Sequence, residues 1–260
     1  MTLIRTIAGP AITALICLAI WEVGCRAFKV PDFVLPTPTR TFAALISDWD
    51  VIWPNAFQTL STTTMGFGGA VVFGFLLGVA VGWSPFLNSC FSPLLIAFNS
   101  VPKVAIVPVL VLWFGIGTIP AAITAFALSF FPITINVAAG ISATEVELID
   151  VLRSLGATRF DIIRKVGVPR SLPYLFASLK VAITLAFVGS VISETVASNV
   201  GIGYLMLSAS AAFRIPLVFA ALMVVAALGV TMYGITALIE QLLTGDDKLE
   251  EAQVTFAAGG

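Results

Sequence analysis

The sequence predicts an all-α membrane protein with about six transmembrane helices. Of its 260 residues, 59% are hydrophobic and only 10% are charged, and the mean hydropathy is +1.06. A soluble domain of this size carries about 25% charged residues, so we expect most of this chain to face lipid. The charged residues are also grouped, which leaves long apolar segments between them.

Six apolar segments have the length of about 20 residues that a transmembrane helix needs. The predicted spans are residues 7–27, 57–82, 88–115, 119–141, 172–197 and 216–242. Pro102 and Pro108 interrupt the third span, which is expected to kink or to begin as a half-helix. The chain therefore divides into a first helix with an external segment (1–56), a transmembrane domain (57–243) and a polar cytoplasmic tail (244–260).

A short charged segment separates the fourth and fifth predicted spans. Between Ala56 and Thr144, Lys103 is the only charged residue, whereas the 26 residues from Glu145 to Arg170 contain nine charged residues. Five of these nine are Arg or Lys, so the positive-inside rule places this loop in the cytoplasm. With six spans, both termini lie on the same side.

The composition excludes several functional classes. The chain has no His and only three, widely spaced Cys residues, so neither a metal site nor a catalytic centre is expected. A net charge of −1 argues against binding nucleic acid. The phosphate-binding pattern Gly-x-x-x-x-Gly-Lys-Ser/Thr does not occur, so we do not expect this chain to hydrolyse ATP.

Residues 142–170 predict two short amphipathic helices joined by a bend. Three residue pairs have capping-box spacing: Ser142 with Glu145, Thr144 with Glu147, and Thr158 with Asp161. Apolar residues recur at helical spacing at Ile149, Leu152 and Leu155, and again at Phe160, Ile163 and Val166. Gly156 lies where a left-handed C-cap would fall, and Pro169 is expected to end the second helix. The segment is either a solvated loop or a docking element for a cytoplasmic partner.

The spacing within this segment resembles the EAA signature of ABC-transporter importer permeases. The family pattern is Glu-Ala-Ala, three residues, Gly, nine residues, Ile, one residue and Leu-Pro. This chain has Asp150-Val151-Leu152, three residues, Gly156, nine residues, and Val166-Gly167-Val168-Pro169. The spacing agrees throughout and the Gly and Pro match, whereas the other positions are substituted.

Other motifs resemble the branch of this family that serves nitrate, sulfonate and taurine uptake. They are Val34-Leu35-Pro36-Thr37-Pro38, Ser100-Val101-Pro102-Lys103, Leu112-Trp113-Phe114-Gly115-Ile116-Gly117, Ser154-Leu155-Gly156-Ala157-Thr158-Arg159 and Gly201-Ile202-Gly203-Tyr204-Leu205. The resemblance implies a type I importer fold with two membrane subunits, two cytoplasmic ATPase subunits that bind ATP and Mg, and an external solute-binding protein. For this branch it implies a homodimer of permeases.

The resemblance also implies residues that couple the permease to its ATPase. These are Asp150, Arg153, Ser154, Leu155, Gly156, Ala157, Thr158, Arg159, Phe160 and Pro169. Their expected contribution is mechanical: the hairpin moves with the ATPase and the spans rock between inward and outward openings.

Three residues inside the spans are candidates for the translocation pathway. Lys103 follows a helix break, where it could pair with a freed carbonyl or an anionic substrate, or lie at a subunit interface. Glu194 could line the pathway or a gate, and Trp113 is either a pathway residue or a packing anchor. Lys180 is expected to snorkel towards a membrane edge. Gly66, Gly68, Gly69, Gly74 and Gly78 favour close helix contact along the second span.

The sequence leaves the substrate open. The family resemblance suggests small anions, such as nitrate or an alkylsulfonate, as the first candidates. The alternative substrates are a thiamin-precursor pyrimidine, riboflavin or an aromatic acid. A second functional class is an ion-coupled secondary transporter with Lys103 and Glu194 as coupling charges. That class predicts an internal repeat and more intramembrane ionisable residues, and the sequence shows neither.

Overall fold

The computed structural model describes residues 2–244, with the side chains of residues 2–8, 10, 11, 146 and 244 left out of the description. The described part is helical throughout and contains no strand. Its elements are α1 (Thr2–Ala27), α2 (Pro38–Ser47), α3 (Trp49–Trp83), α4 (Pro85–Ser100), α5 (Lys103–Phe114), α6 (Thr118–Ser142), α7 (Val146–Ser154), α8 (Arg159–Ile162), the π-helix η1 (Ile163–Gly167), α9 (Val168–Ala197), α10 (Ile202–Ala211) and α11 (Ile215–Thr244). The predicted tail, 244–260, lies outside the described residues apart from Thr244.

The membrane-spanning prediction is confirmed in outline. Four helical segments are long and apolar enough to span a membrane: Trp49–Trp83, Thr118–Ser142, Arg159–Ala197 and Ile215–Leu243. α4 and α5 together make a fifth candidate, although their axes meet at 91°. α1 coincides with the first predicted span.

The predicted break in the third span lies at Val101 and Pro102. The N–H of Val101 still bonds to the carbonyl of Phe98, at 3.3 Å, but Pro102 has no N–H with which to continue α4. α5 therefore begins in a new direction, and the predicted single span from 88 to 115 is two helices.

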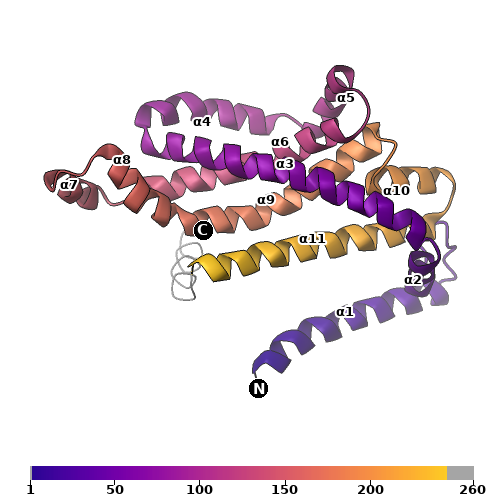
Figure 1. Cartoon of the computed structure of the whole chain (residues 1–260). Helices are drawn as coiled ribbons and strands as arrows, with labels where there is room; N and C mark the ends of the chain where they lie inside the picture. Colours follow the sequence, from indigo (N-terminus) through magenta and orange to yellow (C-terminus); the bar gives the residue numbers. More distant parts are fainter. Residues whose placement is uncertain (1, 245–260) are drawn as a thin grey trace.

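α3, α6 and α9 pack into the tightest part of the bundle (Figure 1). Gly66, Gly74, Gly78 and Gly82 recur every fourth or eighth residue along the face of α3 that meets α6. A Cβ atom added at Gly78 would lie 2.7 Å from the Cβ of Val137, so only glycine fits. The predicted close contact is confirmed for Gly66, Gly74 and Gly78, whereas Gly68 faces open space.

Apart from the contact between α3, α6 and α9, another apolar core joins α10 and α11 to the start of α3. It consists of Ile52, Ala56, Ile202, Leu205, Ala209, Leu217, Ala220, Ala221 and Val224. Residues 49–56 were expected in the external segment; they form the first turns of α3, and their place relative to the membrane stays a prediction. α3 begins at Trp49 because Ile52 and Ala56 are fully buried in this core. The short helix α10 was not predicted.

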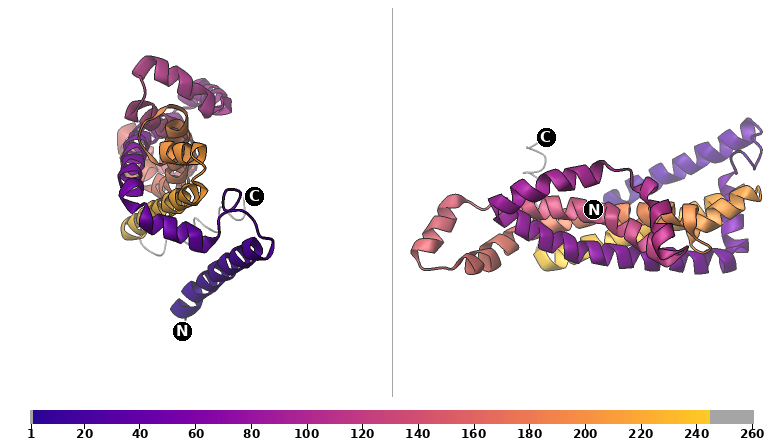
Figure 2. Two further views of the ribbon diagram at one scale, coloured as in Figure 1. Left: turned by 90° about the vertical axis from the view of Figure 1, so that its right-hand side faces the viewer. Right: turned by 90° about the horizontal axis from the view of Figure 1, so that it is seen from above.

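The two ends of the bundle differ in shape. Figure 1 and the right-hand view of Figure 2 show α7 and α8 protruding as a hairpin from one end, whereas α2 and α10 lie at the other. We call these the hairpin end and the α10 end. α1 lies apart from the α3, α6 and α9 bundle and touches α11 through the rings of Trp21 and Phe219, whose centroids are 5.8 Å apart.

Candidate functional site

The bend of the hairpin forms at Gly156, as the sequence predicts. Gly156 has a φ of +83°, a region that residues with a Cβ rarely occupy. Its N–H bonds to the carbonyl of Arg153 at 2.9 Å, and the N–H of Ala157 bonds to the carbonyl of Leu152 at 3.0 Å. These two bonds make a Schellman motif, which ends α7 sharply.

The capping predictions are confirmed for the second hairpin helix and wrong for the first. The Thr158 hydroxyl accepts from the N–H of Asp161 at 3.2 Å, and the Asp161 carboxylate accepts from the N–H of Thr158 at 3.1 Å. The N-cap of α7 is Glu145, which makes no side-chain cap. Its carboxylate instead pairs with Arg170 at 3.2 Å and so joins the two ends of the hairpin.

The prediction that Pro169 ends the second helix is wrong. α8 continues through η1 into α9, and Pro169 lies in the first turn of α9. The N–H of Val168 bonds to the carbonyl of Ile163, five residues back. Because proline has no N–H, a helix through Pro169 loses one backbone bond, and this widened turn accommodates the loss.

Three large apolar side chains are exposed on the hairpin. They are Val151, Leu155 and Phe160, and the last two are 77% and 68% exposed. We call these three the tip residues. Ile162, which the sequence did not single out, is instead the buried residue of α8. Exposed apolar side chains on a protruding, charged element are typical of a docking surface.

All ten predicted coupling residues are exposed except Ala157, which is half-buried. Arg153 and Asp150 form an exposed ion pair at 3.3 Å. Ser154 donates to the carbonyl of Val151 at 2.7 Å. Their assignment to ATPase coupling stays a prediction.

Lys103 bonds to the helix break itself. Its side-chain nitrogen donates to the carbonyls of Phe98, Asn99 and Val101 at 2.6, 3.1 and 2.9 Å. The last carbonyls of a helix have no partner within it and attract positive charge. Of the alternatives that the sequence left open, the freed carbonyls are the partner seen in the structure.

Glu194 is 1% exposed; it belongs to the last turn of α9 and contacts the start of α10. Its carboxyl group accepts from the Thr59 hydroxyl at 2.7 Å, the Thr62 hydroxyl at 3.3 Å and the N–H of Gly203 at 3.1 Å. Glu194 therefore connects α9 to α3 and α10. We call this group the Glu194 network.

Two further bonds from α3 extend the Glu194 network. Asn55 accepts from the N–H of Gly201, and Thr59 accepts from the N–H of Ile202, both at 2.8 Å. Gly201 has a φ of +104°, and a Cβ there would lie 2.3 Å from the carboxyl carbon of Glu194. Sequence reasoning missed Asn55, Thr59 and Thr62, although polar residues at helical spacing in an apolar span were a signal that they have a buried partner.

Lys180 pairs with Glu240 of α11 at 2.7 Å, a partner that the sequence did not suggest. Glu240 is buried, and an unpaired charge there would be costly in lipid. The pair fixes α11 against α9.

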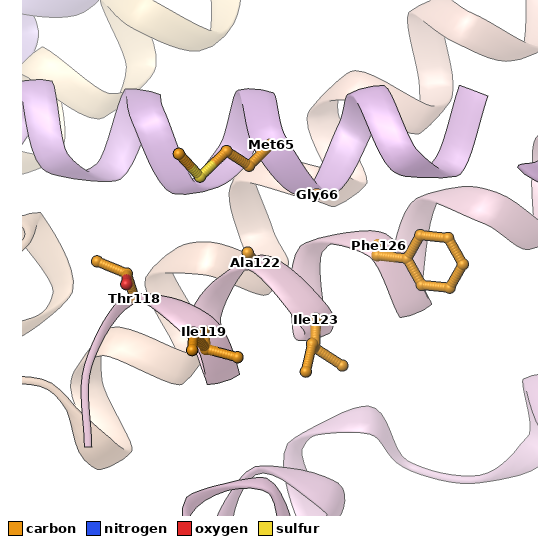
Figure 3. Close-up of a pocket in the computed structure, with 7 residues that line it drawn as sticks. All are labelled: Met65, Gly66, Thr118, Ile119, Ala122, Ile123 and Phe126. Atoms are coloured by element: carbon orange, nitrogen blue, oxygen red, sulfur yellow. The ribbon is translucent and has the colours of Figure 1, made fainter. Parts of the chain in front are cut away.

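The predicted pathway residues do not converge within one chain. Trp113 is exposed and contacts the ring of Phe114, and among the described residues no hydrogen bond joins it to Lys103 or Glu194. A cavity of about 240 Å³ lies between α3 and α6, and its lining includes Met65, Ile123 and Phe126 (Figure 3). Assignment of Lys103, Trp113 and Glu194 to the pathway stays a prediction. Among the described residues, no group of three His, Cys, Asp or Glu side chains is placed to hold a metal.

The chain is a multi-pass helical bundle with a charged hairpin between two spans, and comparison with known proteins identifies its class. Residues 70–245 match the family described as "Binding-protein-dependent transport system inner membrane component". The chain belongs to this family and is a permease of the ABC importer type.

Several relatives share most of their length with this chain. It is 34% identical to the riboflavin transport system permease protein RibX of Chloroflexus aurantiacus, over 90% of this chain and 88% of the relative. It is 28% identical to the formylaminopyrimidine transport permease protein ThiX of Halalkalibacterium halodurans (90% and 94%). It is 25% identical to the taurine transport system permease protein TauC of Escherichia coli (82% and 80%).

The fold is also that of a solved importer. An inward-facing structure of the MetNI methionine ABC transporter aligns with a TM-score of 0.62 and 19% identity, over 74% of this chain and 97% of that chain. This likeness confirms the type I permease fold.

Proposed function

We propose that two copies of this chain form the translocation pathway of an ATP-driven importer. In this arrangement the hairpin end lies in the cytoplasm, where each hairpin docks on one of two ABC ATPase subunits that bind ATP and Mg. The α10 end faces an external solute-binding protein, and both termini are cytoplasmic. The tip residues are the observation that carries the proposal, because they expose apolar surface where the family resemblance expects the ATPase.

The geometry of the hairpin suits the transmission of force. Its bend is held by backbone bonds at Gly156, and its ends are joined by the pair between Glu145 and Arg170. α8 runs through η1 into α9 without a flexible linker. A movement of the hairpin would therefore pass directly into α9.

The test is retention of the neighbouring ATPase by the purified chain in detergent. Gly156→Pro should abolish retention, because proline cannot adopt a φ of +83°. Gly156→Asn is the matched control, since asparagine tolerates this region, and it should retain most of the ATPase. Equal retention by Gly156→Pro would contradict docking through the hairpin.

For the substrate we propose a small, uncharged nitrogen heterocycle of the riboflavin or pyrimidine type. The relative that transports riboflavin, by its name, is more similar to this chain than those named for taurine or sulfonates. In addition, both intramembrane lysines already have partners: Lys103 bonds to carbonyls and Lys180 to Glu240. Neither is therefore placed to attract nitrate or a sulfonate.

The substrate test is uptake by cells that express the complete system. Labelled riboflavin and a formylaminopyrimidine are compared with taurine, an alkylsulfonate and nitrate. Uptake of a heterocycle that needs ATP and survives collapse of ion gradients supports the proposal. Uptake of an anion alone would overturn the substrate class, and uptake driven by an ion gradient would favour the secondary transporter.

A further inference from the structure

A second cavity lies where the hairpin meets the membrane spans. Its volume is about 510 Å³, and its walls come from the end of α3, the start of α4, the end of α6 and both hairpin helices. The charged residues in its lining are Arg153 and Arg159, and no acidic residue lines it. Two positive charges on one cavity favour an anion between them.

Neither arginine is neutralised strongly within the chain. Arg153 has an exposed ion pair with Asp150 at 3.3 Å, which solvent screens. Arg159 has no carboxylate within ion-pair distance in the part of the chain that the structure describes. Planar guanidinium groups match phosphate oxygens with two parallel hydrogen bonds.

A buried hydroxyl provides an independent sign of a ligand. Thr144 also lines the cavity, is 6% exposed, and its Oγ1 has no hydrogen-bond partner among the described residues. The nearby Ser142 differs, because it donates to the carbonyl of Gly82 at 3.1 Å. A buried hydroxyl without a partner is costly, and an anionic oxygen in the cavity would accept a hydrogen bond from it.

The position of the cavity favours a lipid headgroup. α3 ends at Trp83 and α6 ends at Ser142, and both residues line the cavity, so it lies at the boundary of the membrane spans. Val81, Ile141 and Ile149 give the cavity an apolar wall, beside the polar side chains of Asn88 and Ser142. This mixture suits an amphiphile whose phosphate meets the arginines and whose acyl chains meet the apolar wall.

We propose that this cavity binds the phosphate of an anionic phospholipid through Arg153, Arg159 and Thr144. The bound lipid joins α7 and α8 to the ends of α3 and α6, and so fixes the angle of the hairpin to the bundle. Binding uses this chain alone, so its test does not depend on whether an ATPase docks.

The experiment is native mass spectrometry of the purified full chain, titrated in detergent with phosphatidylglycerol or phosphatidylcholine. Wild type should bind one phosphatidylglycerol in preference to phosphatidylcholine. Arg153→Gln with Arg159→Gln should weaken phosphatidylglycerol binding about tenfold or more. Arg164→Gln with Lys165→Gln removes the same charge from exposed hairpin positions outside this cavity, and should weaken it less than about threefold.

Thr144→Val tests whether Thr144 binds the lipid phosphate or only supports the structure. Losing a hydroxyl that donates to the phosphate should weaken lipid binding about fivefold, while the melting temperature of the lipid-free protein stays unchanged or rises. Equal losses in both charge pairs, or equal binding of both lipids, would overturn the proposal. Binding of inorganic phosphate with the same dependence on Arg153 and Arg159, but no retained phosphatidylglycerol, would assign the cavity to a free anion instead.

Discussion

The two ends of the bundle are held by different kinds of contact. At the hairpin end, the bend and the second cap use bonds between residues three to five apart, such as Gly156 with Arg153 and Thr158 with Asp161. At the α10 end, Glu194 bonds to Thr59 and Thr62, 135 and 132 residues away. The hairpin is therefore shaped locally and keeps its apolar side chains exposed, whereas α10 is held by buried polar bonds to distant helices.

The largest predicted effect tests the Glu194 network. Glu194→Leu leaves the N–H of Gly203 without its acceptor and leaves the hydroxyls of Thr59 and Thr62 with only backbone carbonyls of α3, so the free energy of unfolding should fall by about 3 kcal/mol. Glu194→Gln keeps one carbonyl acceptor and should lose about 1 kcal/mol. Unfolding in mixed micelles, followed by tryptophan fluorescence, measures both. Equal stability of all three proteins would remove the distinction between the two ends.

A smaller loss is expected where α3 crosses α6, between the two ends. Gly78→Ala places a Cβ 2.7 Å from that of Val137 and 2.8 Å from the carbonyl of Thr134. The resulting overpacking should lower the free energy of unfolding by about 2 kcal/mol. Gly68→Ala, on the open face of the same helix, should leave it unchanged or raise it. The same unfolding assay applies, and similar losses for both would contradict the packing.

The smallest loss is expected at the hairpin. Thr158→Ala removes the cap of α8 and should destabilise that helix by about 1 kcal/mol, while Thr158→Ser keeps the hydroxyl and should have little effect. Hydrogen exchange of residues 159–167 should accelerate in Thr158→Ala, and exchange in α10 should not. Faster exchange in α10 as well would show that the two ends are not independent.

This contrast also explains what the sequence could predict. Gly156 and the pair of Thr158 and Asp161 were identified because their signals lie within one turn of chain. The partner of Glu194 was missed because nothing local connects residue 194 with residue 59. The same holds for Lys180 and Glu240, and for α10, whose burial depends on the distant start of α3.

Two predictions about the hairpin failed because their causes were not visible in the local sequence pattern. The first capping box was wrong because Glu145 pairs with Arg170, 25 residues on, instead of capping α7. Pro169 did not end the helix because the π-turn of η1 precedes it. The break at Pro102 was predicted, but its 91° bend was not, since proline indicates an interruption without its angle.

Whether the ATPase contacts the hairpin end and not the α10 end is tested most directly by photocross-linking at two exposed phenylalanines, one at each end. Phe160 is 68% exposed at the hairpin end, and Phe213, just after α10, is 78% exposed at the α10 end. Each is replaced in turn by benzoyl-phenylalanine in cells that express the ATPase and the binding protein. A cross-link to the ATPase should form from residue 160, and none should form from residue 213. A cross-link to the ATPase from residue 213, or its absence at residue 160, would contradict docking through the hairpin end.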